Sequence, residues 1–231
     1  MTWIEVCVEL PSAARAARRG GARAIELCAD LERGGTTPSH GAVEHARRTR
    51  DLELNVLVRP RAGDFHYGED ERAVMRADVV AARTLGADGV ALGCLRPDAT
   101  IDREATRELV ELARPLRVTF HRAFDLCPDR REALEELVAL GIERVLSSGG
   151  GATALAGSAL LAELVELSAG RIAVIAAGGV RPGNVRSIVD ATRVPGVHFA
   201  ARATSLAGPA GFGTPCDTDE ELVRACVRAL A

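Results

Sequence analysis

The chain has 231 residues, 47% of them hydrophobic and 26% charged, so it is long enough and apolar enough to bury a full core. A net charge of -3 gives no argument for nucleic acid or an anionic membrane surface as a partner, and no apolar run reaches the roughly 20 residues of a membrane span. All 29 basic residues are arginine, and the absence of lysine excludes a Schiff-base aldolase mechanism.

Eight short runs rich in β-branched and apolar residues recur along the chain, separated by amphipathic segments rich in Ala, Leu, Arg and Glu. The runs cover residues 4–8, 24–28, 53–58, 89–92, 117–121, 144–147, 171–176 and 196–200. Strands that alternate with helices predict a parallel sheet, and eight such units predict a single-domain TIM-like (β/α)8 barrel over residues 1–231. We expect a loop over 207–218 and a last helix over 219–230.

A doubly wound open sheet is the alternative fold. It usually carries a glycine-rich turn after the first strand, which binds the phosphates of a dinucleotide. The first run here leads instead into Glu9-Leu10-Pro11-Ser12, which is no such fingerprint. The barrel is therefore the preferred prediction.

Alternation along the first two runs separates an aliphatic face from a polar one. Residues 4, 6 and 8 are aliphatic and must pack on the helices, so Glu5, Cys7 and Glu9 point into the barrel or its mouth. Glu26 and Cys28 occupy the same face of the second run. We therefore expect Cys7 and Cys28 to be near neighbours on adjacent strands.

Carboxylates inside a barrel need positive partners, and the third run supplies candidates. Arg59 falls on its inward face, where we expect it to pair with the carboxylates or to hold a substrate anion. Arg61 and Asp64 follow directly and are further candidate ligand-binding residues.

The fifth run ends in His121, Arg122 and Asp125. Charged side chains at strand ends recur as functional sites in barrels, although a structural ion pair at a loop is the plainer interpretation. His121 is the candidate proton carrier because its ordinary pKa lies near neutrality. Glu9, Glu26 and Asp125 complete the candidate catalytic set.

Glycine-rich segments follow the sixth and seventh runs. They place Ser148 and Gly149 in one loop and Gly178 and Gly179 in the other. Glycines let backbone N–H groups approach an anion closely, and barrels often bind phosphate at their last strands. The alternative is that these glycines only make tight turns. With the charged residues, they predict a site for a small, possibly phosphorylated anion.

Several motifs, in order, resemble the CutC family of copper homeostasis proteins. They are the segments EVCVE (5–9), IELCA (25–29), GGTTPS (34–39), VRPRAGDFHY (58–67), TFHRAFD (119–125), SGG (148–150) and AAGGV (176–180), with Asn184. The match spans about residues 4–202, and it departs from the family pattern at Ala177 and Ala201. The resemblance implies a cytoplasmic, self-associating (homodimeric or larger) TIM-like barrel.

By motif, the resemblance also implies that Cys7 and Cys28 bind Cu(I), an ion that prefers thiolates. The alternative is that both are small buried hydrophobic residues, the common fate of free cysteine. The six cysteines form no CxxC pair, which favours a reduced cytosolic protein over a disulfide framework. Two functions therefore stand: a copper-binding protein, or an enzyme acting on a small anionic metabolite at the mouth.

Overall fold

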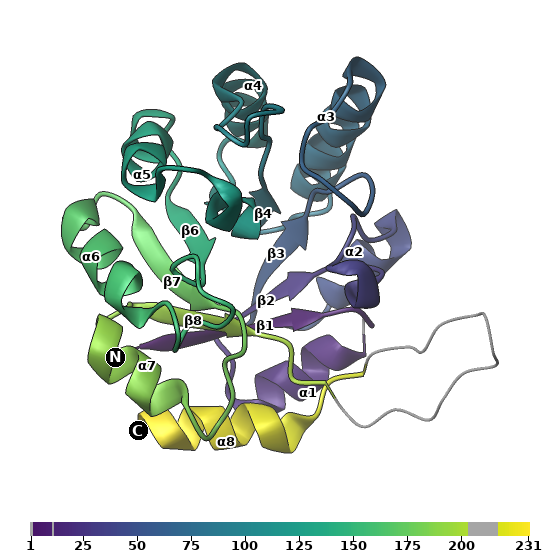
Figure 1. Ribbon diagram of the computed structural model, residues 1–231. Helices are drawn as coiled ribbons and strands as arrows, with labels where there is room; N and C mark the ends of the chain where they lie inside the picture. The colour runs from purple at the N-terminus through teal and green to yellow at the C-terminus, as the bar shows by residue number, and fades with distance from the viewer. Residues whose placement is uncertain (1, 11, 203–216) are drawn as a thin grey trace.

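The computed structural model describes residues 2–10, 12–202 and 217–231. Eight parallel strands close into a barrel in sequence order, and the helices surround it (Figure 1). The strands are β1 (Trp3–Val8), β2 (Ala24–Leu27), β3 (Glu53–Leu57), β4 (Gly89–Leu92), β5 (Arg117–Phe120), β6 (Arg144–Ser147), β7 (Ala173–Ala177) and β8 (Gly196–Phe199). The α-helices are α1 (Ala13–Gly20), α2 (His40–Ala46), α3 (Glu69–Thr84), α4 (Arg103–Ala113), α5 (Arg130–Ala139), α6 (Ser158–Ser168), α7 (Val185–Thr192) and α8 (Glu220–Leu230), and the 3-10 helices are η1 (Leu31–Arg33) and η2 (Arg122–Leu126).

The predicted barrel is confirmed, and the open sheet is excluded because β1 pairs with β8. Each strand lies within two residues of its predicted bounds. The last helix begins one residue later than predicted, because Asp219 caps it by accepting hydrogen bonds from the N–H groups of Glu221 and Leu222. Most of the loop predicted over 207–218 falls at residues outside the described part of the chain.

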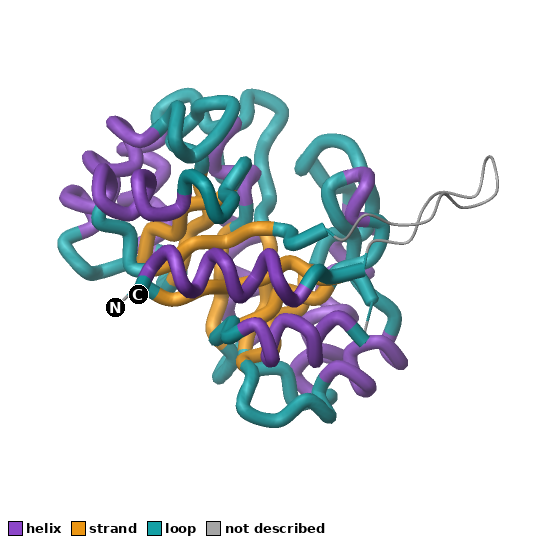
Figure 2. Tube along the Cα trace, turned by 90° about the horizontal axis from the view of Figure 1, so that it is seen from below, coloured by secondary structure: helices purple, strands orange, loops and turns teal. Residues whose placement is uncertain are grey.

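Helix α8 completes the outer ring by packing beside α1 (Figure 1), and in Figure 2 it is the helix that ends at the label C. Gly20 permits this contact, since a Cβ there would lie 2.6 Å from the Cβ of Val223. The strand faces also follow the predicted alternation. Ile4 and Val8 of β1 belong to the core beneath the helices, whereas Glu5 and Cys7 meet polar side chains inside the barrel.

An ionic and aromatic cluster fills the N-terminal end of the barrel. Glu53 accepts hydrogen bonds from Arg117 and Arg144, the second at 2.6 Å. The guanidinium of Arg144 also lies over the Trp3 ring, 4.5 Å from its centroid. Because these residues start β1, β3, β5 and β6, they meet across the barrel axis and close this end.

Candidate functional site

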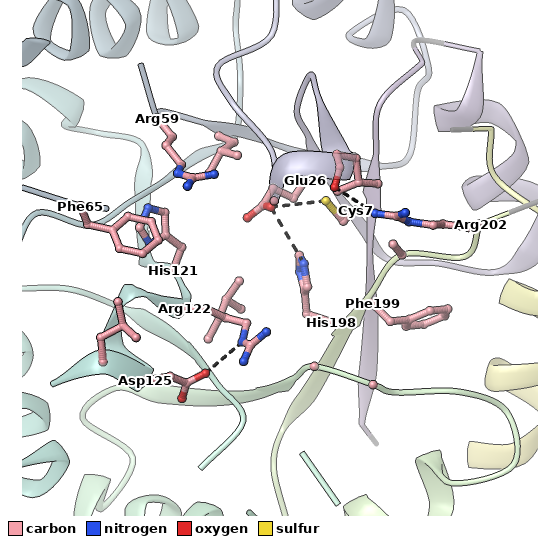
Figure 3. A pocket seen from close by; sticks show the side chains of 18 of the residues that line it. Cys7, Glu26, Arg59, Phe65, His121, Arg122, Asp125, His198, Phe199 and Arg202 are labelled. Atoms are coloured by element: carbon pink, nitrogen blue, oxygen red, sulfur yellow. Dashed lines mark hydrogen bonds and ion pairs between the residues drawn. The ribbon is translucent and has the colours of Figure 1, made fainter. Parts of the chain in front are cut away.

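A cavity of about 570 Å³ opens at the C-terminal ends of the strands (Figure 3). Its walls combine apolar side chains such as Leu57, Phe65 and Phe199 with charged ones. Four arginines and two carboxylates line it: Arg59, Arg122, Arg181, Arg202, Glu26 and Asp125. Cys7, His121 and His198 also face it, so residues from separate strands converge as the predicted barrel requires.

The two cysteines of the predicted metal site lie together, as expected from their alternation. The Cys7 and Cys28 sulfurs are 3.6 Å apart, and Cys7 Sγ is also 3.6 Å from Glu26 Oε1. Cys7 lines the cavity, whereas Cys28 is fully buried behind it and donates to the Val8 carbonyl. The hydrogen bond with Cys28, burial and the nearby Glu26 carboxylate hold the pKa of Cys7 well above its ordinary value.

His198 is a site residue that the motif analysis left out. Its Nδ1 is 2.8 Å from Glu5 Oε1, and its Nε2 is 3.9 Å from Glu26 Oε1. The register of the barrel explains this grouping, because Glu5 pairs with His198 across β1 and β8, and Cys7 pairs with Glu26 across β1 and β2. The available signal was the inward position of His198 in β8, but closure onto β1 was needed to reveal its partners.

Burial and neighbouring charges shift the pKa values of this cluster in opposite directions. Burial alone would lower the pKa of His198, but the Glu26 and Glu5 carboxylates outweigh it and raise that pKa. Burial raises the pKa of Glu26, which the charge of His198 only partly offsets. The carboxylates thus favour the protonated form of His198, while burial favours the protonated form of Glu26 at the inner end of the cavity.

Arg59 points into the mouth as predicted, but it does not pair with the carboxylates. It is 5% exposed, and its guanidinium donates to the carbonyls of Gly35 at 2.7 Å, Gly63 at 2.8 Å and Arg33 at 3.2 Å. It also lies over the ring of Phe65, 4.9 Å from its centroid. The prediction of an ion pair is wrong, because backbone carbonyls in the loops after β2 and β3 accept the hydrogen bonds of the Arg59 guanidinium.

His121 lies at the mouth but is not poised to carry a proton at neutral pH. Burial and the charge of Arg59 lower its pKa to about 3. Its Nδ1 accepts a hydrogen bond from the Ala123 N–H, which leaves the proton of the neutral ring on Nε2. The expected role as proton carrier rested on an ordinary pKa, which His121 does not keep here, and its neutral ring presents an Nε2–H donor.

Asp125 is held by a network at the start of the sixth βα loop. Its carboxylate accepts from the hydroxyls of Ser147 at 2.6 Å and Ser148 at 3.0 Å, and from the Ser148 N–H. Arg122 Nε donates to the same carboxylate at 2.9 Å. Asp125 therefore orients Arg122 on the cavity wall, where a Cβ at Gly178 would lie 3.3 Å from Arg122 Cζ.

The other predicted residues divide between the cavity and its surroundings. Gly178 and Gly179 line the cavity with left-handed backbones, while Ser148 and Gly149 stand behind Asp125. Besides Cys28, Ser148 and Gly149, three more predicted residues are absent from the cavity lining in the described part of the chain: Glu9, Arg61 and Asp64. Glu9 accepts from the Asp30 N–H, and Arg61 pairs with Asp64 and with Glu71 of α3.

Comparison with known proteins identifies the family of this barrel. Residues 2–203 match the CutC family. The chain belongs to the CutC family. A family protein CutC of Chromobacterium violaceum is 46% identical over 199 residues, covering 86% of this chain and 81% of the relative. The human copper homeostasis protein cutC homolog is 44% identical over 205 residues, covering 89% of this chain and 75% of the relative.

The fold agrees with that assignment. A crystal structure of a CutC protein from Streptococcus agalactiae superimposes with a TM-score of 0.83 at 32% identity, over 86% of this chain and 98% of that one. The family resemblance drawn from the motifs is thus confirmed. In the described part of this CutC chain, every helix is too short or too polar to cross a membrane.

Proposed function

We propose that this CutC chain acts in copper homeostasis by binding one Cu(I) ion at Cys7 and Cys28. The observation that carries the proposal is the pair of thiols 3.6 Å apart at the inner end of a cavity, with one of them facing that cavity. Cu(I) prefers soft sulfur ligands and accepts few of them. The names of the curated relatives, which refer to copper homeostasis, support the same assignment.

The surrounding residues fit a metal ion. Ligand atoms of Cys7, Glu26 and His198 lie within 4.8 Å of one another. His198 faces Glu5 through Nδ1, so its Nε2 is the nitrogen directed toward Cys7 and Glu26. A histidine whose second nitrogen is held by a carboxylate is the usual arrangement at metal centres. We assign His198 as the third ligand beside the two thiols.

The charge of the site makes copper uptake a proton-releasing reaction. The raised pKa of Cys7 keeps its thiol protonated at neutral pH until a metal replaces the proton. We also propose a cytoplasmic location, because the five cysteines in the described residues are all free and buried.

A chelator competition tests the copper site. Reduced protein is titrated with Cu(I) against bicinchoninate, and the native chain is compared with the Cys7→Ser, Cys28→Ser and His198→Gln variants. The matched control is Cys226→Ser, which removes another buried thiol on the outer helix α8. We expect the first two variants to lose most of the affinity and the control to keep it. Equal affinity in all four variants would remove copper from this site.

A further inference from the structure

The cavity above the thiol pair holds polar groups that copper does not use. We propose that it is a binding site for a small polyhydroxylated anion, of the size of a phosphorylated or carboxylated sugar fragment. The observation behind the proposal is a set of buried polar atoms on the cavity wall with no hydrogen-bond partner among the described residues: Arg59 Nε, Glu26 Oε2 and His121 Nε2.

Arg59 gives the clearest indication of an anion. It is 5% exposed and makes no ion pair within the described part of the chain, since its partners are backbone carbonyls. A buried guanidinium without an anion is costly, because its lost hydration is not repaid by an opposite charge. Figure 3 shows its guanidinium reaching toward the middle of the cavity from one side. An anion there would supply the missing partner.

Arginines on the opposite wall extend the positive charge. Arg122 is half-exposed and shares its charge with Asp125, but Arg181 makes no ion pair among the described residues and donates to its neighbouring carbonyl of Val180. With Arg202, the cavity lining carries four arginines against two carboxylates, in a chain whose net charge is -3. The cavity lining is therefore net positive although the chain as a whole is net negative.

The other two unpartnered atoms define the rest of the ligand. The neutral ring of His121 has an Nε2–H donor, which an oxygen acceptor on the ligand would satisfy. Glu26 Oε2 is an acceptor that a donor such as a hydroxyl would satisfy, while Oε1 of the same carboxylate faces Cys7 and His198. A hydroxyl group can satisfy both kinds of partner, because it donates one hydrogen bond and accepts others.

The size and walls of the cavity fit such a molecule. Its volume of about 570 Å³ lies within the range of small-molecule sites. Gly178 approaches Arg122 closely with a left-handed φ of 101°, and a Cβ there would lie 3.3 Å from Arg122 Cζ, so a side chain at this position would crowd the arginine on the cavity wall. Phosphate and carboxylate ligands share this chemistry, so the experiment must separate them.

Binding is tested by titrating isotope-labelled protein with glycerol 3-phosphate, glycerate and inorganic phosphate, and following backbone amide shifts by NMR. We expect the amides of Gly178, Gly179 and Ala123 to shift on binding, while Trp3 at the closed end stays unchanged. The phosphorylated probe and the carboxylated probe distinguish the two anions. Inorganic phosphate binding as tightly as either probe would contradict the assigned role of the hydroxyl groups.

Variants give the second readout. Arg122→Gln and Glu26→Gln should each weaken binding of the better probe by roughly tenfold or more, the effect of losing one charge-assisted hydrogen bond. Arg76→Gln, on the outer face of α3, should bind as the native chain does. Circular dichroism and thermal melting check that each variant folds. If no probe shifts the cavity amides of the native protein, or if both cavity variants bind unchanged, the proposal is overturned.

The anion site and the copper site can fail separately. The Cys7→Ser/Cys28→Ser variant keeps all the polar groups of the proposed anion site, so it should bind the better probe with the affinity of the native chain. Loss of anion binding in that variant would contradict a site built from Arg59, Glu26 and His121 alone.

Discussion

His121 makes a sharp prediction about acid stability. Its folded-state pKa of about 3, against an ordinary 6.5, means that the unfolded chain takes up a proton on acidification before the folded chain does. Stability therefore falls as the pH drops below the unfolded pKa, and the loss stops only near the folded value. Replacing His121 with Gln should remove this contribution while retaining a polar side chain of similar size.

The magnitude follows from the two pKa values. Each pKa unit corresponds to about 1.4 kcal/mol, so between pH 7 and pH 5 the native chain should lose about 2 kcal/mol that His121→Gln does not lose. At pH 5 the folded ring is still neutral, so this difference is set almost wholly by the unfolded chain. The figure is therefore insensitive to how far below pH 5 the folded pKa lies.

Urea unfolding at pH 7, 6 and 5, followed by circular dichroism, measures the difference. The control is His40→Gln at the exposed start of α2, which should keep the full pH dependence of the native chain. If the native chain and His121→Gln lose the same stability between pH 7 and pH 5, His121 is protonated in the folded state. The assignment of a neutral Nε2–H donor would then be wrong.

Three further predictions concern other parts of the molecule. Glu53→Gln should lower the free energy of unfolding in urea by about 3 kcal/mol or more, because it leaves Arg144 buried without its carboxylate partner. The control Glu44→Gln, on the exposed face of α2, should lower it by under about 0.5 kcal/mol. Equal losses in the two variants would contradict this prediction. Asp125→Asn should cost about 2 kcal/mol in the same assay, because its oxygens accept from two serines and Arg122, and no measurable change would mean that the network is not stabilising. Cu(I) affinity should rise about tenfold per pH unit for each proton released from Cys7 or its neighbour, and a flat profile between pH 6 and pH 8 would show that the thiols are already ionised.

The strands could be predicted from the sequence because alternation and turn residues are local signals. Cys7 and Cys28 could be placed together for the same reason, since each lies on the inward face of consecutive strands. Once the barrel was inferred, the side of each residue followed from its position in its strand.

The partners of those residues could not be predicted, because they depend on contacts between distant segments. Arg59 finds carbonyls in two loops rather than a carboxylate, which depends on the path of residues 33–35 and 63. The pKa of His121 depends on burial and on Arg59, which no local pattern reports. His198 became a site residue only through the pairing of β8 with β1.

The cluster of Trp3, Glu53 and Arg144 at the N-terminal end has a consequence for exchange kinetics. With that end filled, an ion reaches Cys7 through the mouth of the cavity, between Arg59 and Arg122. A molecule held in the outer cavity would lie between Cys7 and the open mouth, so a metal ion already bound at the thiols would leave after that molecule. A metal ion beneath it would be retained by obstruction, in addition to its bonds to sulfur, and its release rate would track the lifetime of the molecule above.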